Sequence, residues 1–239
     1  MYSESSTIAA ISTSMSEAGI GIVRMSGEDA FEIADRIYRG KNNKRLSGQK
    51  SHTIHYGYIE EDGETIDEVL VMLMRGPRTF TGEDTVEINC HGGVYVLQRV
   101  LEACLRGGAR PAQPGEFTKK AFLNGKLDLS QAEAVIDVIQ SRNDYALKSS
   151  VSQLRGSVKK KVSDIRAKIL YHTAFIESAL DDPEHISIDG YSRTLEKDVR
   201  ELLDSLRKLL DSADDGRIMK EGIQTVIVGK PNAGKSSIL

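Results

Sequence analysis

The chain has 239 residues, of which 39% are hydrophobic and 28% charged, and its formal net charge is −3. This balance is typical of one large folded domain or two modest ones, and it argues against a disordered acidic tail or a strongly basic nucleic-acid module. The chain has no tryptophan and only 5% aromatic residues, which argues against a surface on which single-stranded bases stack.

The number of cysteines and the hydropathy of the chain indicate its cellular compartment. Cys90 and Cys104 are too few for a disulfide framework or a cysteine-based zinc site, which favours a reducing environment. His91 follows Cys90, but two potential ligands adjacent in sequence rarely meet one ion, so a structural role is the simpler interpretation. No apolar run approaches the ~20 residues of a membrane span, and the first ten residues lack a basic signal region. We therefore expect a cytoplasmic protein with no membrane span.

The first half of the chain mixes strands and helices. Apolar patterning predicts strands at 7–13, 20–25, 53–59, 66–74 and 85–90. Ser26 is expected to cap a helix between the second and third strands, and a turn is expected at 61–63. A second helix carries an apolar face and ends at Gly107-Gly108; the face comprises Val94, Leu97, Leu101 and Cys104, which places Cys104 in the core. This order of elements predicts an α+β domain that ends near residue 118.

The next part of the chain is predicted to be all helical. Ser130 and Glu133 have the spacing of a capping box, so a helix should begin at about residue 130. A continuous, nearly straight helix of about 55 Å is expected over 144–180, because apolar residues recur there every eleven positions. A third helix is expected over 191–213. Its apolar stripe and that of the long helix need partners to cover them.

The last residues contain a phosphate-binding pattern. A strand-like segment, 224–228, precedes Gly229–Ser236, which matches G-x-x-x-x-G-K-[ST]. In this motif backbone N–H groups cradle phosphates, the lysine neutralises phosphate oxygens and the hydroxyl binds Mg²⁺. A glycine turn with a solvated lysine is the alternative. Hydrolysis also needs a water-positioning group and a second Mg²⁺-binding carboxylate, which lie downstream of a P-loop, so we expect residues 1–239 alone to be inactive as an NTPase.

Four segments in order resemble the MnmE/TrmE family of tRNA-modifying GTPases: 19–27, 79–93, 110–139 and 221–237. The resemblance spans essentially all 239 residues and implies three parts. Residues 1–118 would form an α+β tetrahydrofolate-binding and dimerisation domain. Residues 119–220 would form the first part of a helical domain, and residues 221–239 the first strand and P-loop of an α/β GTPase domain. The chain would thus be truncated just after the P-loop.

The resemblance also implies site residues. Arg24, Glu87 and Lys126 match the family's contacts to 5-formyl- or 5,10-methylene-tetrahydrofolate. A carboxylate suits the adjacent amino and N–H groups of a pterin, and the two cations suit its carbonyl or its anionic glutamate tail. An ordinary Arg–Glu ion pair is the alternative for the first two. No general base is apparent, so no catalytic residue is assigned.

The resemblance to the family also implies roles for the P-loop residues. GTP phosphates would be held by Asn232, Ala233, Gly234, Lys235, Ser236 and Ser237, with Ser236 binding magnesium and Asn232 potassium. The implied function of the full-length protein is carboxymethylaminomethyl modification of the wobble uridine of tRNA, driven by GTP hydrolysis. Its implied partners are tRNA, a second copy of the chain and an FAD-dependent protein of the MnmG/GidA family.

Two segments depart from the family pattern: STSMSEAG replaces a Pro/Gly-rich loop, and LDDPEHI replaces a more acidic segment. Basic side chains on the predicted long helix could meet tRNA phosphates or form a solvated face; they are Arg155, Lys159, Lys160, Lys161, Arg166 and Lys168. Two other functions are consistent with the motifs. One is a non-catalytic helical scaffold or dimerisation module, and the other is a fragment of a ribosome-associated GTPase.

Overall fold

The computed structural model describes residues 7–40 and 44–221, and near the C-terminus residues 226, 228–230, 234 and 237. The chain divides into two compact units, Met1–Ala132 and Glu133–Leu239. The boundary falls within helix α4 (Leu129–Gln140).

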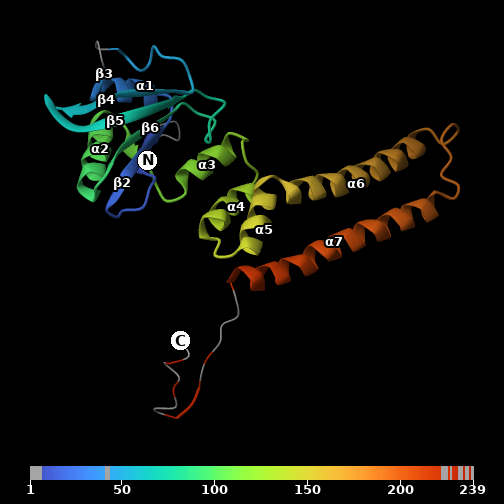
Figure 1. The fold of residues 1–239 in the computed structure, drawn as a ribbon. Coiled ribbons are helices and arrows are strands. Elements are labelled where there is room, and N and C mark those ends of the chain that lie inside the picture. Colours follow the sequence, from blue (N-terminus) through green and yellow to red (C-terminus); the bar gives the residue numbers. More distant parts are fainter. Residues whose placement is uncertain are drawn as a thin grey trace. The chain divides into compact units, whose positions relative to one another are not determined.

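The first unit is built on a seven-stranded sheet with the strand order β3-β4-β5-β6-β2-β1-β7, of which Figure 1 labels strands β2 to β6. Neighbouring strands are antiparallel except β1 and β7, which are parallel. Asp62 and Gly63, both with positive φ, form the tight turn between β4 and β5, as the sequence predicted. The strands are β1 (Ile8–Ile11), β2 (Ala18–Ser26), β3 (Tyr38–Gly40), β4 (Thr53–Glu61), β5 (Glu64–Met74), β6 (Thr85–Gly92) and β7 (Arg110–Pro111).

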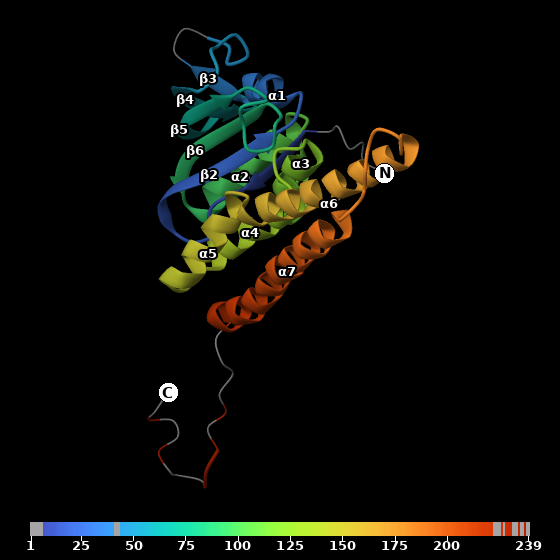
Figure 2. The ribbon, with the colours of Figure 1, turned by 90° about the vertical axis from the view of Figure 1, so that its right-hand side faces the viewer.

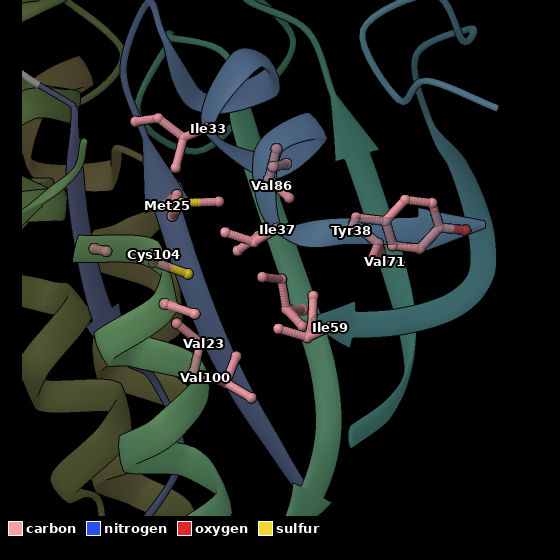
Figure 3. Packing of buried hydrophobic residues seen from close by; sticks show 14 of the residues in the cluster. Val23, Met25, Ile33, Ile37, Tyr38, Ile59, Val71, Val86, Val100 and Cys104 are labelled. Atoms are coloured by element: carbon pink, nitrogen blue, oxygen red, sulfur yellow. The ribbon is translucent and has the colours of Figure 1, made fainter. Parts of the chain in front are cut away.

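Helices α1 (Ala30–Ile37) and α2 (Val94–Arg106) pack on one face of this sheet and enclose the core. Every second residue of the central strands points into it, as does the apolar face of each helix (Figure 3). Cys104 is fully buried there, which confirms its predicted place in the core. Burial raises the pKa of the Cys104 thiol to about 12 and that of Cys90 to about 11, so both thiols stay protonated at neutral pH.

The opposite face of the sheet carries the intervening residues of β2 and β6. Arg24 and Ser26 lie on it from β2, and Thr85 and Glu87 from β6. Helix α3 (Glu116–Leu123), which the sequence did not predict, also belongs to this unit. Part of the face is apolar and exposed in the first unit, and this part includes Ile20, Ile54, Tyr56 and Leu70.

The second unit contains helices α5 (Asp144–Leu154), α6 (Ser157–Asp181) and α7 (Tyr191–Glu221), together with most of α4. Helices α6 and α7 form an antiparallel hairpin (Figure 2). The nearly buried His172 of α6 joins the two helices, since Nδ1 lies 2.6 Å from Tyr191 Oη and Nε2 lies 3.1 Å from Asp198 Oδ2.

The fold class is confirmed, because an α+β unit precedes a helical one. Three details of the predicted helices are wrong. Ser26, expected to cap the first helix, is instead the last residue of β2, and α1 begins after Asp29. The expected continuous helix over 144–180 is broken at Gly156, whose φ of 86° is left-handed and ends α5, so the eleven-residue pattern continues across two helices. The capping box at the start of α4 lies two residues earlier than expected, where Asp128 and Gln131 each accept the other's backbone N–H at 3.0 Å.

Within the part of the chain that the structure describes, no helix is both long enough and apolar enough to cross a membrane.

Candidate ligand site

Arg24 and Glu87 are direct cross-strand neighbours on β2 and β6. Arg24 Nε lies 2.7 Å and Nη2 lies 2.6 Å from the same oxygen, Glu87 Oε1. The Glu87 side chain is 15% exposed and that of Arg24 is 30% exposed. No residue in the described ranges donates a hydrogen bond to Glu87 Oε2. The pair therefore presents one open carboxylate oxygen beside a fixed guanidinium.

An aromatic ring lies next to this pair. The Arg24 guanidinium is 5.7 Å from the centroid of the Phe117 ring, near the start of α3. The start of α3 is fixed by Glu116, whose carboxylate pairs with Arg110, and these hydrogen bonds hold the pKa of Glu116 below its ordinary value. A hydrogen-bond acceptor, a cation and an aromatic ring thus meet at one end of the outer sheet face.

Lys126, the third predicted residue, follows α3 and lies against the loop over residues 77–84, called the 77–84 loop below. Its Nζ donates to the carbonyl of Pro77 at 2.9 Å, and its backbone N–H donates to the carbonyl of Ala121 at 2.9 Å. Gly82 has φ of 83°, and a Cβ there would lie 3.3 Å from Lys126 Cγ. The structure thus brings Arg24 and Glu87 into contact with each other, whereas Lys126 contacts the 77–84 loop.

A polar network that the sequence did not predict lies beneath the same loop. Lys120 of α3 is 5% exposed, and its Nζ lies 2.7 Å from Glu83 Oε2. Ser26 Oγ lies 2.7 Å from Thr81 Oγ1, and both residues are fully buried. The signal available in the sequence was the spacing of Thr79, Thr81, Glu83 and Thr85, which puts polar side chains on one side of the chain just before a buried strand.

Cys90 and His91 point to opposite faces of the sheet. Cys90 is in the core, whereas His91 is exposed and its Nδ1 lies 2.7 Å from Asp67 Oδ1. This hydrogen bond raises the pKa of His91 above its ordinary value. Among the described residues, no group of three or more His, Cys, Asp and Glu side chains is arranged to hold a metal ion.

Most of the predicted phosphate-binding residues lie outside the described residues: Asn232, Ala233, Lys235 and Ser236. Of the others, Gly234 has φ of 75°, and the N–H of Ser237 donates to its carbonyl at 3.0 Å. The basic residues predicted to meet tRNA are exposed on α6 and at the end of α5, and one of them, Lys168, lies 3.5 Å from Glu201 of α7.

Two family models match the chain. The model described as the GTP-binding protein TrmE N-terminus matches residues 7–126, which include Arg24, Glu87 and Lys126. The model described as the MnmE helical domain matches residues 129–235.

Curated relatives match as well, under the name tRNA modification GTPase MnmE. The protein from Lachnoclostridium phytofermentans is 58% identical over 234 residues, which are 98% of this chain and 51% of the relative. The protein from Acetivibrio thermocellus is 51% identical over 241 residues, covering 100% of this chain and 52% of the relative. The chain thus spans about half the length of these relatives, and with both family models matched in order it belongs to the MnmE/TrmE family.

Proposed function

We propose that the first unit binds a reduced folate, 5-formyl- or 5,10-methylene-tetrahydrofolate, at the Arg24–Glu87 pair. Through it the chain would contribute a one-carbon unit to carboxymethylaminomethyl modification of the wobble uridine of tRNA. The observation that carries this proposal is the geometry of the pair, in which Arg24 occupies one oxygen of Glu87 and leaves the other open.

The chemistry of the site suits a pterin. Its 2-amino group and ring N–H need an acceptor, which Glu87 Oε2 supplies, and its carbonyl needs a donor, which Arg24 supplies. The Phe117 ring beside Arg24 is suited to a flat heterocycle. The exposed ammonium of Lys126 suits the anionic glutamate tail of the same ligand. Bound there, the folate supplies the one-carbon chemistry, and these side chains bind and orient it.

The P-loop residues would bind GTP with Mg²⁺ at Ser236 and K⁺ at Asn232, and GTP hydrolysis would belong to the full-length protein. The names of the relatives support GTPase activity and tRNA as its context. An FAD-dependent protein of the MnmG/GidA family would be the redox partner. A polypeptide of residues 1–239 is expected to show no GTP turnover, because it contains no water-positioning residue after the P-loop.

We also propose that the first unit forms a homodimer. The apolar side chains exposed on the outer sheet face of this unit support the proposal, because a contiguous apolar surface favours association. Sedimentation of the chain as a monomer at micromolar concentration would contradict the dimer.

A cytoplasmic location is proposed on the two buried, unpaired thiols, which suit a reducing compartment.

Calorimetry with 5-formyl-tetrahydrofolate tests folate binding directly. The wild-type chain should show saturable binding. Glu87→Ala should weaken this binding at least about tenfold, because the 2-amino group and ring N–H of the bound pterin lose their acceptor. Glu60→Ala is the matched control, since Glu60 forms an ion pair with Arg39 at 3.4 Å at the distant β3–β4 edge. A wild-type chain that does not bind, or a Glu87→Ala chain that binds as well as wild type, would instead support the non-catalytic scaffold.

A further inference from the structure

Lys120 is unusual because its ammonium group is buried. The residue is 5% exposed, in the middle of α3, and its Nζ lies 2.7 Å from Glu83 Oε2. Removing a lysine charge from water costs several kcal/mol on general grounds, and well-packed apolar residues in place of a buried ion pair are often equally stable or more so. An ion pair with this cost is weak evidence for stability, so the contacts of its two members are the better guide to its role.

The pair connects three elements around the ligand site. Ser26 Oγ donates to Glu83 Oε2 at 3.3 Å, and Ser26 lies two residues beyond Arg24 on β2. On the other side, Asn124 at the end of α3 donates through Nδ2 to the carbonyl of Thr81 at 2.8 Å. Glu83 is thus fixed between β2 and α3, and the 77–84 loop is fixed with it.

The loop in turn carries the contacts of Lys126. Thr79 Oγ1 donates to the carbonyl of Glu83 at 2.7 Å and accepts the N–H of Gly82 at 2.9 Å, so the position of Glu83 sets that of Gly82. Gly82 faces Lys126 closely enough that a Cβ would lie 3.3 Å from Lys126 Cγ. The carbonyl of Pro77 at the start of the loop accepts the Lys126 ammonium at 2.9 Å.

From these contacts we propose that Lys120 is a positioning residue for the ligand site. Its ion pair with the half-buried Glu83 holds the 77–84 loop between α3 and β2, and the loop sets the Lys126 ammonium in place for an anionic group of the ligand. The proposal rests on the proposed folate function. It goes beyond that function because it assigns a role to Lys120 and Glu83, which are not among the proposed ligand contacts.

A double-mutant cycle separates this role from a general effect on the fold. Lys120→Met should weaken 5-formyl-tetrahydrofolate binding about tenfold in the wild-type background, and less than about twofold in the Lys126→Ala background, because Lys120 acts through Lys126. Lys119→Met is the matched control, since Lys119 is its exposed neighbour on the same helix, and it should bind like wild type. Lys120→Arg, which keeps the charge, should recover most of the affinity.

Two results would overturn the proposal: affinity of Lys120→Met equal to that of wild type, or equal losses in both backgrounds. If Lys120→Met does not fold, Lys120→Met combined with Glu83→Gln removes both charges of the pair, and the same cycle applies to it. If the wild-type chain binds no folate, the proposed function fails, and the positioning role is then tested by hydrogen exchange. The amides of Gly82 and Glu83 should exchange faster in Lys120→Met than in Lys119→Met, and equal rates would overturn the role.

Discussion

The two units differ in how they bury apolar side chains. The first unit encloses a continuous core between its sheet and two helices, with residues such as Leu73 and Ile88 fully buried. The described part of the second unit buries chiefly small residues, including Ala146 and Ala179, whereas Leu180 is 71% exposed. This contrast indicates that the first unit has the packing to hold a precise ligand site, and that the helices of the second unit present apolar surface for association.

The largest expected effect is the loss of stability on a core substitution, and it measures how the two units differ in packing. Ile88→Ala, in the core of the first unit, should lower the free energy of unfolding by about 2–5 kcal/mol, because it leaves a cavity in a close-packed interior. Ile169→Ala on α6 should cost much less, since that side chain is 51% exposed in its unit. Urea unfolding followed by circular dichroism measures both. A cost for Ile169→Ala as large as that for Ile88→Ala would mean that α6 is tightly packed in solution.

The next largest expected effect on stability concerns the polar contact between α6 and α7. His172→Ala should destabilise the helical hairpin by about 1 kcal/mol, because it leaves the half-buried side chains of Tyr191 and Asp198 without their partner. The control is His185→Ala, whose side chain is 78% exposed. Hydrogen exchange of the α6 amides is the measurement. Equal protection in the two variants would show that the hairpin does not depend on His172.

A pair of glycine substitutions sharpens the account of the 77–84 loop. Gly82→Ala and Gly63→Ala place a Cβ at nearly the same backbone angle, φ of 83° and 84°. Each should lose about 1 kcal/mol to backbone strain. Only Gly82→Ala also crowds its neighbours, Asn124 Cβ at 3.2 Å and Lys126 Cγ at 3.3 Å, because the space around Gly63 is open. Folate affinity should therefore fall in Gly82→Ala alone, and equal affinity in both variants would contradict the placement of Lys126.

The smallest expected effect concerns pH. Because the hydrogen bond to Asp67 raises the pKa of His91, protonated His91 favours the folded state at pH values below the ordinary value of 6.5. This contribution is lost as the pH rises through the elevated folded pKa. NMR titration of His91 should give a midpoint above 6.5 in the wild type and a lower midpoint in Asp67→Asn. An unchanged midpoint in Asp67→Asn would mean that the pair does not form in solution.

Local patterns in the sequence predicted much of the fold. Period-two strands, the turn at Asp62-Gly63 and the place of Cys104 in the core are all set by neighbouring residues, and the structure has them. The break at Gly156 was missed because an apolar repeat continues across it, and a single glycine does not by itself show that its φ is positive. Strands β3 and β7 are too short to show a periodicity.

The arrangement of the candidate site was predicted only in part. Arg24, Glu87 and Lys126 came from resemblance to a family, and the structure shows that the first two are in contact while Lys126 lies against the 77–84 loop. The pairing of Lys120 with Glu83 joins residues 37 positions apart. No local pattern predicts it, because it depends on how α3 returns to the sheet.

We propose that Glu87 accepts hydrogen bonds from the amino edge of a pterin. The most direct test of this proposal compares 5-formyl-tetrahydrofolate with an analogue that lacks the 2-amino group, by calorimetry on wild type and Glu87→Ala. The wild type should prefer the amino-bearing ligand by about tenfold or more, because the analogue leaves the carboxylate without its donor, and Glu87→Ala should bind both alike. The same preference in both proteins would contradict the assignment of Glu87.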